Sequence, residues 1–147
     1  PYVQDAPEYL ELTNIDKLLD SSDFLATVAP LNEETMGFLN AKRLSLMKKG
    51  SALITVSGVS IVDQTALLKS IDSGHLSGAA IDVFDTHPVA PDSPLLSSDS
   101  IILTPHIGGA TYETIDRYSR MVAKDLLLFT ENTTPINIVN PEVQNHI

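Results

Sequence analysis

One histidine lies between a short apolar run and a long helical pattern, in the stretch Thr104-Pro105-His106-Ile107-Gly108-Gly109-Ala110-Thr111. Residues 100–103 predict a short buried strand, and the pattern that follows the stretch predicts a helix. His106 is therefore expected on a loop at a strand end, where proteins often place residues that transfer protons. Gly108 and Gly109 have no Cβ, so the backbone can turn tightly and let a flat ligand approach. A polar loop residue after a proline is the other interpretation of His106.

The composition predicts a folded globular protein. The 147 residues are 43% hydrophobic, which is enough for one domain with a sizeable core. The 9 basic and 19 acidic residues give a formal charge of −10, which disfavours nucleic acid and anionic membranes as partners. Apolar runs fall short of the roughly 18 residues that a membrane span needs. Cysteine is absent, which excludes disulfides and thiolate chemistry and fits a cytoplasmic location.

Four apolar runs predict an α/β fold with a parallel sheet. They cover residues 24–29, 52–56, 78–84 and 100–103, and helical patterns separate them. Each run is nearly continuous in small or apolar residues, which predicts burial on both faces beneath flanking helices. Four strands leave at least one exposed edge, so we expect a partner. That partner is either a missing N-terminal half of the same sheet or a second copy of the chain.

The first two segments between these runs predict helices, whereas the third, with three prolines within residues 88–94, predicts a surface loop. Residues 35–39 and 41–47 are typical of short helical pieces. Residues 62–71 carry apolar side chains on one face, as a crossover helix does. A final helix over residues 112–129 carries an apolar stripe that we interpret as core packing, and residues 132–147 are expected to form a tail.

Three motifs occur in order along the chain. They are Ile54-Thr55-Val56-Ser57-Gly58-Val59-Ser60-Ile61-Val62-Asp63, Gly78-Ala79-Ala80-Ile81-Asp82-Val83-Phe84 and Thr104-Pro105-His106-Ile107-Gly108-Gly109. Together they resemble the D-isomer-specific 2-hydroxyacid dehydrogenases, with the 3-phosphoglycerate dehydrogenase branch nearest, and the resemblance runs to about residue 143. It implies that residues 1–147 are the second half of a Rossmann-type NAD(P)-binding domain with its C-terminal helix. The family's glycine-rich phosphate loop and ribose-binding acid would precede Pro1.

The resemblance also implies a chemistry. In the family, a hydride passes between nicotinamide and C2 of a small 2-hydroxy or 2-keto acid, while a histidine accepts or donates the hydroxyl proton. His106 matches that histidine, and the coenzyme would be NAD, with NADP as the alternative. The positions that match contacts along the nicotinamide side are Ala29, Val56, Ser57, Gly58, Asp82, His106, Gly108 and Gly109.

Asp82 allows two interpretations. It is a carboxylate inside an apolar strand, a placement that demands a specific partner. The resemblance implies a position near the nicotinamide ribose or carboxamide. A strand-end residue that is satisfied by backbone N–H groups is the equal alternative.

Two positions depart from the family pattern. Gly58 stands where the family has a carboxylate-binding arginine, and His87 stands where it has a glutamate that pairs with the histidine. Without the arginine the chain lacks a planar charged fork for a carboxylate. Without the glutamate it lacks the anion that would favour protonated His106. Arg117 or Arg120 could replace the arginine, although both also fit a solvated helix face.

Two functions therefore remain open. The first is a portion of an NAD(P)-dependent oxidoreductase that acts on the CH–OH group of a small D-2-hydroxy acid, paired as a homodimer. The second is a catalytically inactive, dehydrogenase-like module that serves binding or assembly. No metal is expected, because no carboxylate-histidine spacing accompanies His87 and His106.

Overall fold

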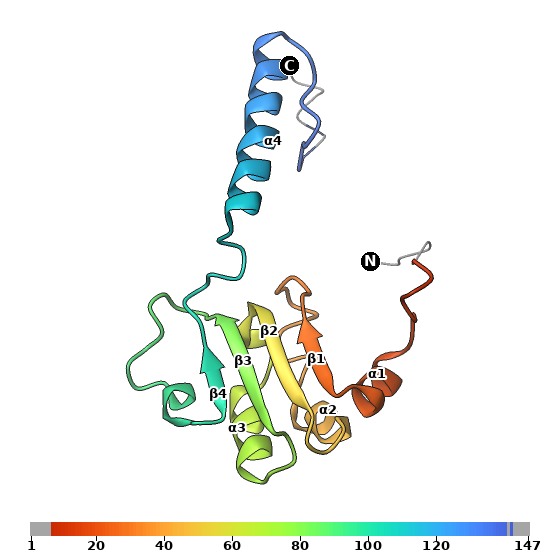
Figure 1. Ribbon diagram of the computed structural model, residues 1–147, viewed down its shortest axis with the longest axis vertical. Coiled ribbons are helices and arrows are strands. Elements are labelled where there is room, and N and C mark those ends of the chain that lie inside the picture. The colour runs from red at the N-terminus through yellow and green to blue at the C-terminus, as the bar shows by residue number, and fades with distance from the viewer. Residues whose placement is uncertain (1–6, 141, 143–147) are drawn as a thin grey trace. The chain divides into compact units, whose positions relative to one another are not determined.

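Parallel strands build one sheet in the part of the chain that the computed structural model describes, residues 7–140 and 142. The strands are β1 (Phe24–Thr27), β2 (Ala52–Gly58), β3 (Gly78–Val83) and β4 (Ile101–Leu103). They pair in chain order, and Figure 1 shows their arrowheads pointing the same way. The predicted α/β fold with a parallel sheet is confirmed.

Three of the described helices follow the predicted pattern, and the helix before β1 was not predicted. The helices are α1 (Ile15–Ser21), α2 (Ala41–Leu46), α3 (Gln64–Asp72) and α4 (Tyr112–Thr130), with short 3-10 turns at Val59–Ile61 and Pro94–Ser97. The helix expected over residues 35–39 is wrong, because this segment is a turn. Gly37 has a φ of 61°, which is outside the right-handed helical region, and Leu39 forms a parallel bridge with Val62.

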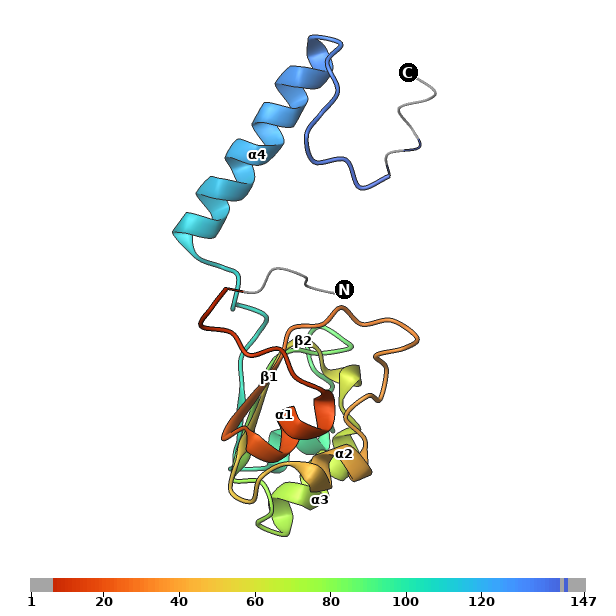
Figure 2. The ribbon, with the colours of Figure 1, turned by 90° about the vertical axis from the view of Figure 1, so that its right-hand side faces the viewer.

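The core lies between the sheet and the three short helices. Figure 2 shows α1, α2 and α3 on the same side of the sheet. Side chains such as Leu53, Leu67 and Ile81 are buried in one hydrophobic cluster. The opposite side chains of the strands are uncovered, since Phe24 is 72% and Ile102 69% exposed. The prediction of burial on both faces is therefore wrong for the outer strands.

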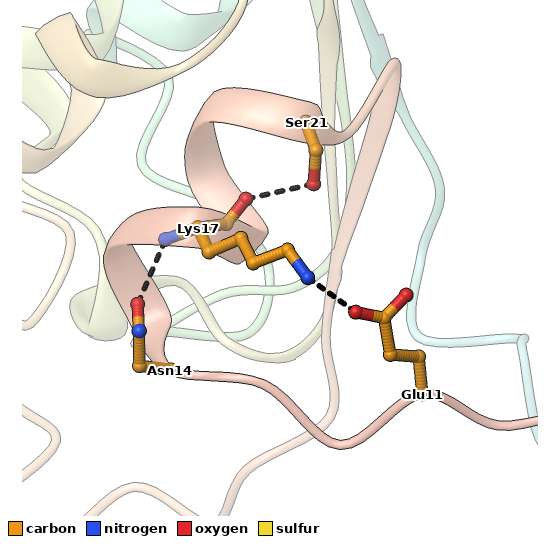
Figure 3. Close-up of polar contacts among 4 residues, drawn as sticks. All are labelled: Glu11, Asn14, Lys17 and Ser21. Atoms are coloured by element: carbon orange, nitrogen blue, oxygen red, sulfur yellow. Dashed lines mark hydrogen bonds and ion pairs between the residues drawn. The ribbon is translucent and has the colours of Figure 1, made fainter.

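Side chains of α1 and the segment before it set the start of that helix (Figure 3). The Asn14 side chain accepts a hydrogen bond from the Lys17 backbone N–H at 2.9 Å, which satisfies one of the unpaired donors of the first turn. The Lys17 ammonium pairs with Glu11, and this hydrogen bond and charge lower the pKa of the Glu11 carboxyl. Ser21 donates to the Lys17 carbonyl at 2.7 Å near the other end. These contacts stabilise the helix that precedes β1.

The chain divides into two compact units between Ile107 and Gly108, and the second unit contains α4. No residue of α4 is buried, and its apolar stripe stays between 43% and 68% exposed at Ile115, Tyr118, Val122, Leu126 and Phe129. Within this unit, therefore, the stripe is not packed in a core as predicted. The chain returns along the helix, because Asp125 accepts hydrogen bonds from Ile136 N and Asn137 Nδ2, both at 2.8 Å. These two bonds lower the pKa of Asp125, with Asn137 as the larger cause.

None of the described helices is both long and apolar enough to cross a bilayer.

Candidate active site

The loop after β4 is bound to the end of β3. The backbone N–H of His106 donates to the Asp82 carbonyl at 2.9 Å. The Asp82 carboxylate accepts hydrogen bonds from the Ile107 N–H at 3.0 Å and from the Thr104 hydroxyl. Asp82 is only 7% exposed, so these bonds compensate a buried carboxylate. One interpretation of the sequence was that backbone N–H groups satisfy Asp82. The bond from the Ile107 N–H to the Asp82 carboxylate is a contact of this kind.

His106 has an uncommon backbone conformation. Its φ is 55°, in the left-handed region that residues with a Cβ rarely adopt. The residue is exposed on the loop between β4 and α4, where the sequence predicted it. The loop therefore presents the imidazole to solvent from a backbone that hydrogen bonds hold in place.

A second imidazole lies beside the first. The ring centroids of His87 and His106 are 5.3 Å apart, with 38° between the ring planes. His87 also contacts Phe84, edge to face, with 6.5 Å between the ring centroids. The carboxylate closest to His87 in sequence, Asp85, is engaged elsewhere, because it accepts a hydrogen bond from Ser60 Oγ at 2.7 Å. The structure thus brings His87 to the position where a partner of His106 was expected.

Small and hydroxyl-bearing residues follow β1 and end β2. Ser57 Oγ lies 3.2 Å from both Thr27 Oγ1 and the Thr27 carbonyl oxygen. At Gly58, an added Cβ would meet the end of the Leu31 side chain at 3.2 Å, and its three nearest neighbours all belong to that side chain. A side chain could therefore enter at Gly58 with a small shift of one flexible neighbour. Ala29 and Val56 at the same ends are exposed.

Most of the expected site residues gather at one edge of the sheet. Ala29 follows β1, Val56, Ser57 and Gly58 end β2, Asp82 lies near the end of β3, and His106 follows β4. In parallel α/β sheets, ligands bind outside this carboxyl edge. Gly108 and Gly109 are the first residues of the second unit.

The two arginines that were considered as substitutes for the missing arginine lie on α4. Arg120 donates from Nε to both carboxylate oxygens of Asp116, at 3.0 and 2.8 Å, one turn away on the same helix. Arg117 is exposed on α4.

Among the described residues, no group of three His, Cys, Asp or Glu side chains could hold a metal ion.

Sequence reasoning missed two hydroxyl residues at this edge. Thr104 donates to Asp82, and Thr27 contacts Ser57. Each is the last residue of its strand or the one after it, so a hydroxyl at a strand end is the signal that could have found them. Their partners are 22 and 30 residues away, which only the sheet register reveals.

A parallel sheet with helices packed on it and polar side chains at its carboxyl edge places this unit among the α/β domains, which bind ligands outside that edge. The comparison with known sequences identifies the family. Residues 1–108 match the NAD binding domain of the D-isomer specific 2-hydroxyacid dehydrogenases, and the chain belongs to that family. This result confirms the resemblance that the three motifs carry.

Individual relatives agree with this assignment. Glyoxylate reductase of Korarchaeum cryptofilum (strain OPF8) is 40% identical over 134 residues, which cover 91% of this chain and 40% of the reductase. D-3-phosphoglycerate dehydrogenase of Escherichia coli (strain K12) is 41% identical over 138 residues, covering 90% and 34%. A D-isomer specific 2-hydroxyacid dehydrogenase from Xanthobacter autotrophicus Py2, solved with NADPH and MES, matches with a TM-score of 0.73 at 29% identity, covering 87% and 52%. The chain thus spans 34–40% of the length of these curated relatives.

Proposed function

We propose that this chain serves as the coenzyme-binding portion of an NAD(P)-dependent oxidoreductase that acts on the CH–OH group of a small D-2-hydroxy acid. The observation that carries the proposal is the position of His106. In a chain of this family, the loop holds an exposed imidazole at the carboxyl edge of the sheet, beside the end of β3. An imidazole is suited to proton transfer near neutral pH.

His106 acts as the acid or base in this proposal. When bound, the nicotinamide supplies or takes the hydride at C2 of the acid. In reduction, protonated His106 gives its ring proton to the keto oxygen, so that a hydroxyl group forms and a neutral imidazole remains. In oxidation, neutral His106 takes the hydroxyl proton.

The residues at the strand ends fit the nicotinamide side of the coenzyme. Ala29, Val56 and Gly58 leave small or apolar surface where a flat ring can approach, and Ser57 adds a hydroxyl group. The family resemblance also assigns Gly108 and Gly109, which follow His106 in the chain, to the coenzyme, whereas the Asp82 carboxylate binds the histidine loop. NAD and NADP both remain candidates, since the acidic residue that binds the adenosine ribose in the family is not among these positions.

Replacing His106 with alanine tests the proposal. We expect the rate of 2-keto acid reduction by the longest native form of the protein to fall about 100-fold to 10,000-fold, because the proton donor is lost. The measurement is NADH or NADPH oxidation with a panel of 2-keto acids. His75→Gln is the matched control, since His75 precedes β3 at the opposite end of that strand. An unchanged rate in the alanine variant would refute the role of His106.

A catalytically inactive binding or assembly module is the second candidate. Gly58 and His87 favour it, because they remove the family's charged fork and the anion beside the histidine. Absence of turnover in the longest native form, with coenzyme still bound, would support this candidate. Turnover that disappears in the His106→Ala variant would exclude it.

We also infer that the protein acts in the cytoplasm as a homodimer. The absence of cysteine fits a reducing compartment. Phe24 and Ile102, 72% and 69% exposed on the uncovered side of the sheet, offer apolar area for association. We expect sedimentation equilibrium to give twice the chain mass; a monomer across the micromolar range would contradict the dimer.

A further inference from the structure

The carboxylate of Asp82 contacts the chain on both sides of His106. One of its bonds comes from the Thr104 hydroxyl, two residues before the histidine, and another from the Ile107 N–H, one residue after it. The Asp82 backbone carbonyl binds the N–H of His106 itself at 2.9 Å. A single residue of β3 therefore contacts three positions of a loop that lies 22 to 25 residues further along the chain.

The backbone of His106 needs such support. A φ of 55° is uncommon for a residue with a Cβ, and conformations of this kind persist only where the surroundings hold them. Thr104 N–H also donates to the Ile81 carbonyl at 3.0 Å, which anchors the start of the loop to the same strand. Without the side-chain bonds of Asp82, the segment after Thr104 would keep a backbone bond at His106 and lose those on either side.

We propose that Asp82 is a positioning residue whose carboxylate clamps Thr104 and Ile107 and thereby holds His106 in the left-handed conformation that presents its ring at the carboxyl edge. Its kinetic consequence rests on the proposed function, whereas the clamp is a property of the folded chain. The role differs from a coenzyme contact, because Asp82 acts through the backbone of the histidine loop. Because Asp82 is only 7% exposed, its carboxylate has little water around it and in turn needs these hydrogen-bond donors.

Amide hydrogen exchange of the chain tests the clamp directly. In Asp82→Ala we expect exchange at Ile107 to accelerate about tenfold or more, because the N–H loses a charged acceptor. In Asp82→Asn the amide oxygen can still accept, so Ile107 should stay within about threefold of the wild type. Asp85→Ala is the matched control, since that carboxylate binds Ser60 and should leave Ile107 unchanged. Unaltered protection of Ile107 in Asp82→Ala would overturn the proposal.

The same spectra separate local release from loss of the fold. The amides of Leu53 and Ile81 lie in the central strands, so they report on the whole sheet. If they keep their protection while Ile107 loses it, the loop alone has been released, as the proposal requires. If Asp82→Ala unfolds, Thr104→Val removes one donor and leaves the carboxylate in place. Faster exchange at Ile107 in that variant supports the clamp, and unchanged exchange there overturns it.

Kinetics of the longest native form then distinguish positioning from coenzyme contact. We expect Asp82→Ala to lower kcat at least tenfold with a change of less than about threefold in the Kd of the reduced coenzyme, and Asp82→Asn to recover most of kcat. A weakened Kd with kcat retained would overturn positioning in favour of a coenzyme contact. If the wild type has no turnover, the proposed function fails. The exchange measurements still decide whether Asp82 holds the histidine loop in place.

Discussion

Replacing Gly78 with alanine should destabilise the sheet strongly, although it adds only one methyl group. A Cβ at Gly78 would lie 2.4 Å from the backbone carbonyl oxygen of Ser100. That oxygen accepts the N–H of Ala79 at 3.1 Å, so it cannot retreat without breaking the bond that leads into the β3–β4 pair. Overpacking against backbone that cannot shift costs about 3 kcal/mol or more.

Thermal denaturation measures this effect. For a unit of this size we expect Gly78→Ala to lower Tm by about 10 °C or more. Gly109→Ala is the matched control, because a Cβ there meets nothing within 4 Å. A Tm of Gly78→Ala within about two degrees of the wild type would mean that β3 and β4 separate more easily than their hydrogen bonds suggest.

The second large effect is expected at the family's arginine position. In Gly58→Arg the new Cβ comes within 3.2 Å of the end of the flexible Leu31 side chain, and its three nearest neighbours all belong to that side chain, so the backbone can accept the arginine. An arginine there supplies a charged fork for a substrate carboxylate. We expect kcat/KM of the longest native form for 2-keto acids to rise about 10-fold to 100-fold, as two charge-assisted hydrogen bonds allow.

Adding His87→Glu should extend this gain toward higher pH. A carboxylate beside His106 favours the protonated ring, which is the proton donor in reduction. The pH above which reduction declines should therefore move upward, by about one unit. Gly58→Ala and His87→Gln control for size without charge. If the double variant is no more active than the wild type on any 2-keto acid, the site does not take a carboxylate in this way.

Much of the fold was predictable because it follows local patterns. The strands and α3 were found from apolar runs and from one helical stripe, and their positions are confirmed within a few residues. Residues 35–39 were misjudged because their hydrophobic spacing resembles a helix, whereas Gly37 turns the chain and Leu39 bridges to Val62. The stripe of α4 has helical spacing too, and spacing alone does not say what covers it.

The candidate site was predictable only in part. His106 could be placed from the strand and helix around it, since position on a loop is a local property. The contact between His87 and His106, and the bonds from Thr104 and Ile107 to Asp82, join residues about 20 positions apart or more. Such contacts depend on which strands are neighbours and in what register, and one sequence does not encode that locally.

The order of the strands in the sheet has a consequence for how the protein is made. Among β1 to β4, each strand after the first pairs with the strand that precedes it in the chain. Each of β2, β3 and β4 leaves the ribosome after its preceding partner, so this part of the sheet can grow in one direction without waiting for distant segments. The histidine loop comes last in this order, and it takes its conformation on a strand that is already assembled.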